Sequence, residues 1–345
     1  MDGTLRRPPP PPTANPAMGA AEWVLLGALS VLWGGSFFFV EVAVAEVPPL
    51  TLVLARVGLA AAALTLAVRL AGQRLPGDLR GWRDLAVMAT LNNLIPFTLI
   101  VWGQSHIASG LAAVLNATTP LFSVCLAPLL GREERFTAGR VGGVTVGVAG
   151  VAVLVGSDAL GGLGVGVTAQ IAVLGAALAY ALAGIFGRRF AGRPPLVTAA
   201  GQLIAATALT APLALVIDRP WTLPAPSLMT GLAIVALALV STALAYVIYF
   251  RVLATAGATN ILLVTLLVPV TASLLGVGIL GERLAPSDGL GMALIALGLI
   301  AIDGRAWRAL TGSRAAVKGE AKLAEAGGAE DVGADEEDGE PGRDQ

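Results

Sequence analysis

The chain has 345 residues, of which 56% are hydrophobic and 13% are charged, and its mean hydropathy is +0.79. Soluble domains carry roughly 25% charged residues, so this composition excludes a soluble fold of this size. The formal net charge of −1 says nothing about partners, because the charges are confined to loops and tails. We expect no nucleic acid to bind. Cys125 is the single cysteine, which excludes an intrachain disulfide, and we expect no metal site and no cofactor.

The two ends of the chain differ in composition from the rest. Residues 1–22 contain a proline run, Pro8 to Pro12, which favours an extended, solvated conformation. Residues 308–345 are polar and end in an acidic cluster. We expect both segments to be disordered tails.

Between the tails, the sequence predicts ten membrane-spanning helices, because ten apolar runs each approach the ~20 residues that cross a bilayer. The runs lack the alternation of polar and apolar residues that strands show, and in lipid a helix satisfies its own backbone. They are Trp23–Val44, Leu50–Val68, Leu85–Gly103, Ile107–Leu130, Gly139–Gly156, Gly166–Gly187, Pro195–Ile217, Leu228–Phe250, Ala256–Leu280 and Ser287–Ile302.

The basic residues outside these runs lie almost entirely on one side. The tails and one set of alternate loops hold 19 Lys and Arg residues, whereas the other set holds only Arg219 and Arg283. Basic residues collect on the cytoplasmic side of a membrane. This bias predicts cytoplasmic N- and C-termini, and therefore an even number of spans.

The chain also repeats itself. Thirteen residues separate Pro120 from Glu133 and also Pro269 from Glu282, and Gly142 and Gly291 follow at the same spacing in each copy. We expect one repeat over 23–156 and a second over 166–304, each with five spans. Because five is odd, the second repeat must be inverted in the membrane, which is an arrangement typical of transporters.

Several short motifs together resemble one family, the EamA-type transporters of the drug/metabolite transporter superfamily. The motifs are Trp33-Gly34-Gly35-Ser36-Phe37, Pro48-Pro49-Leu50, Arg56, Thr119-Pro120-Leu121-Phe122 and Gly281-Glu282-Arg283-Leu284. Their order over residues 23–304 makes the resemblance more specific than any single motif. It implies a ten-helix inner-membrane carrier with a central cavity that exports small metabolites, amino acids or drugs. Two departures are Glu41, where relatives are often basic, and the turn Gly131-Arg132-Glu133-Glu134.

Two charged residues, Glu41 and Arg56, fall inside predicted spans. Each lies seven residues from the Pro48-Pro49 turn, so the two should sit at matching depth, about 10 Å from that turn at 1.5 Å per residue. We expect them to pair or to face the same cavity. The pair could fix the first helical hairpin, take part in solute binding or proton coupling, or reach separately to the membrane interface.

Further candidates for contact with a solute are Trp33, Asn92, Asn93, Gln202, Thr242 and Tyr246. Asn92 and Asn93 precede Pro96, which removes a helix donor and can kink the third span. In the frame of the repeat they align with Ser241 and Thr242, so paired polar residues at one depth could line a cavity or bond neighbouring helices. Trp33, Gln202 and Tyr246 lie deep in their spans and can stack on or hydrogen-bond to a solute.

These features predict a secondary transporter of a small-molecule solute that works by alternating access in the lipid bilayer, with proton coupling as one option. The alternative is a membrane scaffold without transport or a membrane-embedded enzyme. An enzyme would need a convergent acid/base or metal constellation, and the sequence offers scattered glutamates and a single histidine, His106. We therefore expect no catalytic residue. Neither the solute, the coupling ion nor the oligomeric state follows from the sequence.

Overall fold

The computed structural model describes residues 19–129, 138–159, 164–261, 263–283 and 285–303, and within these ranges the chain is helical, with no strand. Residues 1–18 of the N-terminal tail predicted over 1–22, the whole C-terminal tail and Glu133 of the first-repeat turn lie outside the described residues, whereas the first helix begins already at Ala20. The all-helical fold class is therefore confirmed for the described part of the chain.

In the first half, several predicted spans are single helices and two are broken. The elements are α1 (Ala20–Val44), α2 (Pro49–Leu70), α3 (Leu79–Ala89), η1 (Thr90–Leu94), α4 (Ile95–Gln104), α5 (Ser109–Asn116), α6 (Thr119–Leu129) and α7 (Ala138–Ala159). The third predicted span is thus α3, η1 and α4 in continuation, and the fourth is divided between α5 and α6.

The second half follows the same order. Its elements are α8 (Val165–Phe186), η2 (Gly187–Phe190), α9 (Pro195–Ile217), η3 (Pro220–Thr222), α10 (Leu228–Ala238), η4 (Leu239–Leu244), α11 (Ala245–Ile261), α12 (Val264–Leu275), η5 (Gly276–Leu280) and α13 (Pro286–Asp303). The predicted spans Leu228–Phe250 and Ala256–Leu280 imply a turn at residues 251–255. That turn is wrong, because α11 continues as a helix to Ile261. Arg251 is exposed there, so its charge does not oblige the helix to end.

Seven helical stretches in the described residues are long and apolar enough to cross a membrane, and three shorter apolar helices accompany them. The shorter ones are Val141–Leu154, Val264–Leu280 and Pro286–Ile302. Large apolar side chains such as Val24, Leu66 and Leu274 are more than half exposed on the outside of the bundle. Lipid would cover such faces, whereas in water so much exposed apolar surface would promote aggregation.

The two halves pack against each other in exchanged pairs. Helix α1 contacts α12 of the second half, and α8 correspondingly contacts α5 and α6 of the first. Likewise α4 contacts α8 while α1 contacts α10 and α11, and α3 contacts α9 while α2 contacts α10. The remaining large contacts, α2 with α9 and α7 with α13, join elements at the same place in each half. Such reciprocity is what a pseudo-twofold relation between two halves produces.

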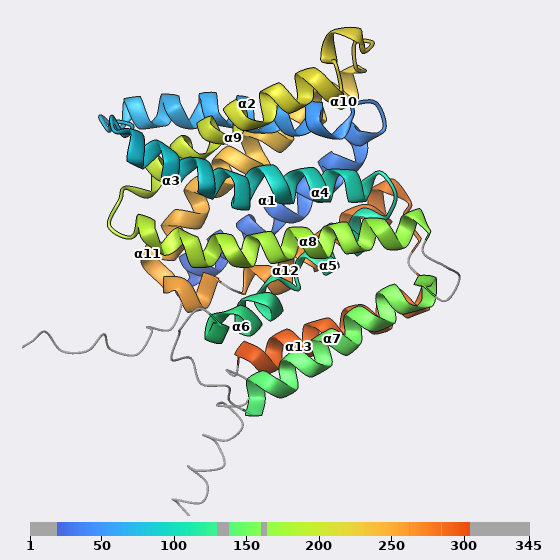
Figure 1. Cartoon of the computed structure of the whole chain (residues 1–345). Helices are drawn as coiled ribbons and strands as arrows, with labels where there is room; N and C mark the ends of the chain where they lie inside the picture. The colour runs from blue at the N-terminus through green and yellow to red at the C-terminus, as the bar shows by residue number, and fades with distance from the viewer. Residues whose placement is uncertain (1–18, 130–137, 160–163, 262, 284, 304–345) are drawn as a thin grey trace, which may run out of the picture.

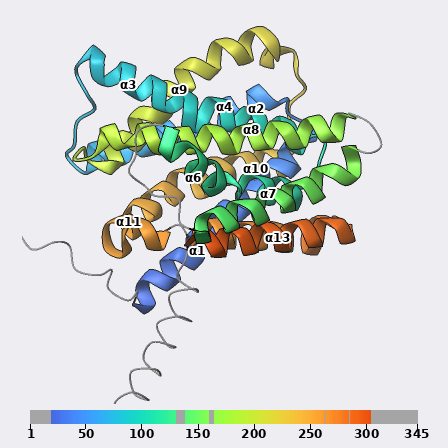
Figure 2. The same ribbon diagram turned by 60° about the horizontal axis from the view of Figure 1, so that its bottom comes forward.

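Helices α7 and α13 lie side by side in both views of the molecule (Figures 1 and 2). Glycines allow this contact: a Cβ on Gly143 would lie 2.7 Å from the carbonyl oxygen of Gly298, and one on Gly150 would lie 2.8 Å from that of Gly291. These distances leave no room for a side chain. Small residues let membrane helices approach closely in this way.

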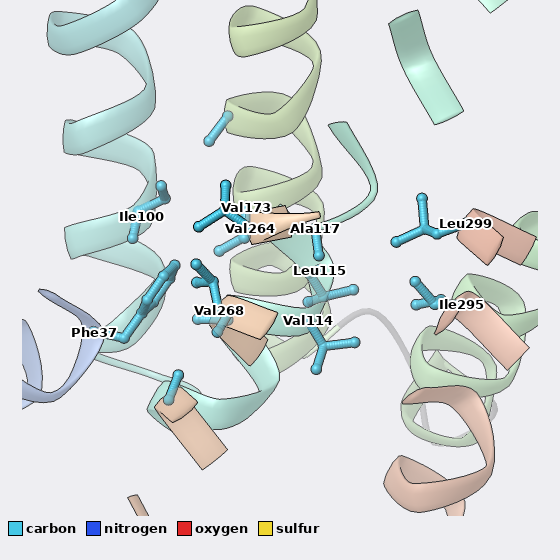
Figure 3. Close-up of a cluster of buried hydrophobic side chains, with 14 of the residues drawn as sticks. Phe37, Ile100, Val114, Leu115, Ala117, Val173, Val264, Val268, Ile295 and Leu299 are labelled. Carbon is cyan, nitrogen blue, oxygen red and sulfur yellow. The ribbon is translucent and has the colours of Figure 1, made fainter. Parts of the chain in front are cut away.

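One of the two apolar cores joins both halves of the chain. Figure 3 shows Phe37 and Ile100 facing Val173, Val264 and Val268, so side chains of α1 and α4 meet those of α8 and α12. The second core is built mainly on α2, α3 and α9. The polar residues described next lie where helices from the two halves meet between these cores.

Candidate functional site

Two segments of π-helix interrupt the spans at equivalent places. Thr90, where η1 begins, lies 30 residues before Pro120, and Leu239, where η4 begins, lies 30 residues before Pro269. Both interruptions fall near the middle of long apolar helices, Leu79–Gln104 and Leu228–Ala256. Segments of π-helix occur frequently at functional sites because they reorient side chains and loosen backbone hydrogen bonds. Sequence reasoning predicted a break near Pro96, and the π geometry itself was not foreseen.

Arg56 of α2 is buried, with 7% of its surface exposed, and it reaches across to the second half. Its Nε donates a hydrogen bond to Oγ1 of Thr242 in η4, at 3.0 Å. The guanidinium carbon lies 3.7 Å from the centre of the Phe97 ring, in a cation–π contact. Thr242 in turn donates to the carbonyl oxygen of Leu237 at 2.8 Å, which fixes the direction of its hydroxyl.

The Tyr246 hydroxyl gathers the other predicted polar residues. It accepts hydrogen bonds from Nδ2 of Asn92 at 3.1 Å and from Nδ2 of Asn93 at 3.4 Å, both of them in η1. Gln202 of α9, which is buried, is a further side-chain partner of this hydroxyl. The structure thus joins two polar groups from the first half to two from the second.

We call these residues the central cluster: Arg56, Asn92, Asn93, Phe97, Gln202, Thr242 and Tyr246. An aromatic series leads away from it along α11. The Tyr246 and Phe250 ring centres lie 6.3 Å apart, those of Phe250 and Tyr249 5.2 Å apart, and Trp33 of α1 lies 5.5 Å from Tyr249. Trp33 is therefore linked to the cluster through the rings of Tyr249 and Phe250.

Glu41 and Arg56 do not form the predicted pair. Among the described residues, the ion pair found is Arg83 with Asp84, at 3.5 Å, far from both. The Glu41 carboxylate instead accepts a hydrogen bond at 3.2 Å from Nε2 of Gln104, which also donates to the carbonyl oxygen of Phe37 at 2.8 Å. Helix α1 presents Glu41 to α4, whereas α2 presents Arg56 to η4.

Three carboxylates join the two halves at the end of the bundle that carries the α1–α2 and α9–α10 connections, on the right of Figure 1. Glu46 accepts from the backbone N–H and the hydroxyl of Ser227, each at 2.7 Å. Asp218 accepts from the backbone N–H of Thr51 at 2.7 Å. Glu282 accepts from the N–H groups of Ser109 and Gly110 at 2.8 and 3.3 Å.

We call this the carboxylate end, defined by Glu46, Asp218 and Glu282. In each contact a carboxylate of one half meets the N-terminus of a helix in the other, where free N–H groups and the helix dipole favour negative charge. The hydrogen bonds from Ser227 lower the pKa of Glu46 from its ordinary value. Glu282 lies near enough to Glu41 for the two charges to interact.

Some members of these sites escaped the sequence analysis. Phe97 was one apolar residue among many, and only its place one residue after Pro96 could have singled it out. Gln104 is a polar residue at the end of a span and could have been recognised as a partner for the buried Glu41. The described residues contain no group of His, Cys, Asp or Glu side chains that could hold a metal ion.

The sequence matches a model of the EamA-like transporter family twice, over residues 21–156 and 167–302. The chain belongs to the EamA-like transporter family. The resemblance drawn from the motifs around Trp33, Pro48 and Pro120 is thereby confirmed. As a member of this family, with long apolar helices throughout, the chain is a membrane transporter.

Individual relatives agree with this assignment. The uncharacterized inner membrane transporter YedA of Escherichia coli K12 is 29% identical over 282 residues, which cover 80% of this chain and 89% of that protein. A protein named as a probable terminal-alkyne amino-acid exporter, from Streptantibioticus cattleyicolor, is 30% identical over 198 residues, 56% of this chain and 62% of the exporter. A protein of known crystal structure superposes with a TM-score of 0.59 at 21% identity, covering 82% of this chain and 98% of its own, and so shares the fold.

Proposed function

We propose that this EamA-like protein is a secondary transporter that exports small solutes, such as metabolites, amino acids or drugs, by alternating access between two inverted five-helix repeats. The exchanged helix contacts between the halves support this arrangement, because they relate the halves by a pseudo-twofold operation. Inverted repeats of this kind can exchange conformations and expose a central site to each side of the membrane in turn.

The observation that carries the proposal is the buried Arg56, which meets Thr242 of the other half in mid-span. A charged residue within a membrane is costly, by about 2.5–3.5 kcal/mol on the insertion scale, and usually marks a solute or ion pathway. The central cluster draws on both halves, so a change in their relative position would alter it. We therefore place the solute site at the central cluster.

In the proposed transport cycle, the carboxylate end is one of the two ends at which the halves separate in turn. Its three contacts join the halves through Glu46, Asp218 and Glu282, so these hydrogen bonds must break when the halves separate at this end. The distribution of basic residues supports an orientation with this end outside the cell and both termini in the cytoplasm of an inner-membrane protein. Helix α1 begins and α13 ends on the opposite side, as Figure 1 shows.

Export is tested in cells that overproduce the full chain and are challenged with toxic amino-acid analogues and antimetabolites. We expect resistance to at least one compound with the wild-type protein, and loss of that resistance with Arg56→Gln at equal membrane abundance. The matched control is Arg83→Gln, which removes the same positive charge from an exposed arginine outside the central cluster. Failure to move any solute in cells or in reconstituted vesicles would contradict the proposal.

Proton coupling through Glu41 forms part of the proposal. Glu41 is half-buried near the carboxylate end, with Gln104 as its donor and Glu282 as the neighbouring negative charge. In vesicles with an imposed pH gradient, we expect wild-type protein to accumulate its solute and Glu41→Gln to lose accumulation while retaining solute exchange without a gradient. Gradient-driven accumulation by Glu41→Gln at the wild-type level would remove Glu41 from this role.

A further inference from the structure

The buried guanidinium of Arg56 has no anionic partner in the described part of the protein. Each carboxylate near enough to consider whose side chain the structure describes is engaged elsewhere: Glu41 with Gln104, Glu46 with Ser227, Asp78 with the N–H of Gly81, Asp84 with Arg83, Asp218 with Thr51, Glu282 with Ser109 and Gly110, and Asp288 with the N–H of Ala285. Glu22 lies in the first turn of α1, far along that helix from the cluster. A buried charge without a counter-ion is strongly unfavourable, so the site calls for an anion.

The guanidinium is held with one edge unused. Phe97 covers its face and Thr242 accepts from Nε, whereas neither Nη nitrogen has a hydrogen-bond partner among the described residues. Neither Nη belongs to the side-chain atoms that are sealed from solvent without a partner. The 7% of Arg56 that stays exposed thus includes the edge that suits a planar anion, to which two parallel N–H groups can donate.

The charge at the site matches a single negative charge. Arg56 is the one charged side chain among the described buried residues; the other buried polar residues are neutral. A monoanion would bring the site to neutrality, whereas a phosphate dianion would leave an excess negative charge buried. In the second half, Gln202 stands where the first half has Arg56, so the symmetric position adds hydrogen bonding and no second positive charge.

Building on the proposed function, we propose that Arg56 is the receptor for the carboxylate of a monocarboxylate solute. The two Nη groups donate to the two carboxylate oxygens, and the apolar part of the solute rests against the ring of Tyr246, which is partly exposed. Tyr246 is fixed by Asn92 and Asn93, so this aromatic surface is preorganised before the solute arrives. Tyr180 also lies within electrostatic reach of Arg56 and adds a phenol to the same surroundings.

The experiment measures binding to the purified full chain in detergent by the shift of its thermal unfolding midpoint. The probes are acetate, phenylacetate, L-leucine and L-phenylalanine, together with phenylacetamide and L-phenylalaninamide, which lack the anion, and phenyl phosphate, which carries more charge. We expect at least one monocarboxylate to stabilise the wild-type protein, its amide to bind at least tenfold more weakly, and phenyl phosphate to bind more weakly than the monocarboxylate. Absence of stabilisation by every monocarboxylate, or equal stabilisation by an amide, would overturn the proposal.

Variants connect the binding to Arg56. Arg56→Gln introduces the residue found in the second half and should weaken monocarboxylate binding at least tenfold, and Arg56→Lys, which keeps the charge without the planar fork, should fall between Arg56→Gln and the wild type. Arg83→Gln should bind as the wild type does. Should Arg56→Gln fail to fold, the comparison of carboxylate with amide on wild-type protein still decides the matter.

The two proposals can fail separately. Reconstituted wild-type protein that transports only solutes without a carboxylate, with no loss in Arg56→Lys, leaves transport standing and removes the carboxylate receptor. Protein that binds monocarboxylates through Arg56 but moves no solute across vesicles leaves the receptor and removes the transport function.

Discussion

The two polar regions in which the halves of the protein meet differ in kind. At the carboxylate end, Glu46, Asp218 and Glu282 each find backbone N–H donors in the opposite half, so their charges are satisfied by hydrogen bonds within the chain. In the central cluster, Arg56 has a hydroxyl and an aromatic ring but no anion. The carboxylate end is therefore satisfied within the chain and holds the halves together, whereas in our proposal the anion of a solute completes the central cluster.

The largest effect is expected from a substitution that removes a hydrogen bond of Arg56 and leaves its positive charge in place. Thr242→Val removes the hydroxyl that accepts from Nε, and a hydrogen bond to a charged group contributes about 1.5–3 kcal/mol. We expect the initial rate of solute transport in vesicles to fall at least about tenfold on that basis.

The matched control lies one residue earlier. Ser241 is buried in the same π segment, and its hydroxyl has no hydrogen-bond partner in the structure. We expect Ser241→Ala to transport at close to the wild-type rate. Equal losses of transport rate in Thr242→Val and Ser241→Ala would show that the π segment responds to any change in packing. The hydrogen bond from Arg56 to Thr242 would then be unimportant for transport.

A smaller effect is expected from Glu282→Gln at the carboxylate end. The amide loses the negative charge that favours the N-terminus of α5, and we expect a loss of about 1–2 kcal/mol of stability together with a severalfold change in transport rate. Thermal unfolding and vesicle transport are measured on the same preparation.

Asp288→Asn separates the two readouts. Asp288 also accepts from a backbone N–H, that of Ala285, but within the second half alone. We expect this variant to lose stability without a change in transport rate. A change in rate as large as that of Glu282→Gln would argue against a special role for contacts between the halves.

The smallest effect concerns pH at Glu46. Because hydrogen bonds from Ser227 lower its pKa in the folded protein, the contact stabilises the fold above the ordinary value of 4.5 and is lost as the pH falls through the lowered pKa. The unfolding midpoint of the wild type should therefore exceed that of Glu46→Gln at pH 7, and the gap should narrow below pH 4.5. Glu22→Gln, outside these contacts, should follow the wild type at both pH values, and a gap that persists in acid would contradict the assignment.

Much of the helical order follows from the sequence alone, because apolar run length decides where a membrane helix can form. Pro195–Ile217 is both the predicted and the observed extent of α9. The break near Pro96 was predicted from the missing backbone donor. Asn92 and Asn93, and the aligned Ser241 and Thr242, fall in the two π segments, but the sequence did not predict the π geometry or the interruption in the second half.

The error over Glu41 and Arg56 has a physical reason. Sequence spacing gives depth along a helix, and neighbours in sequence were assumed to be neighbours in packing. In the structure α2 packs on α9 and α10, while α1 packs on α10, α11 and α12, so the two charges point to different partners. The contacts of Glu46, Asp218 and Glu282 were missed for the same reason, since each joins residues more than 160 positions apart.

The glycine seam between α7 and α13 has a mechanical consequence. At Gly143 and Gly298 the backbones of the two helices touch, and neither glycine has a side chain that could absorb a sliding motion. The two helices can move together as one rigid unit, but one cannot slide along the other without backbone atoms clashing. A single methyl group added at Gly298 would lie 2.6 Å from the carbonyl oxygen of Gly143 and would force the two helices apart.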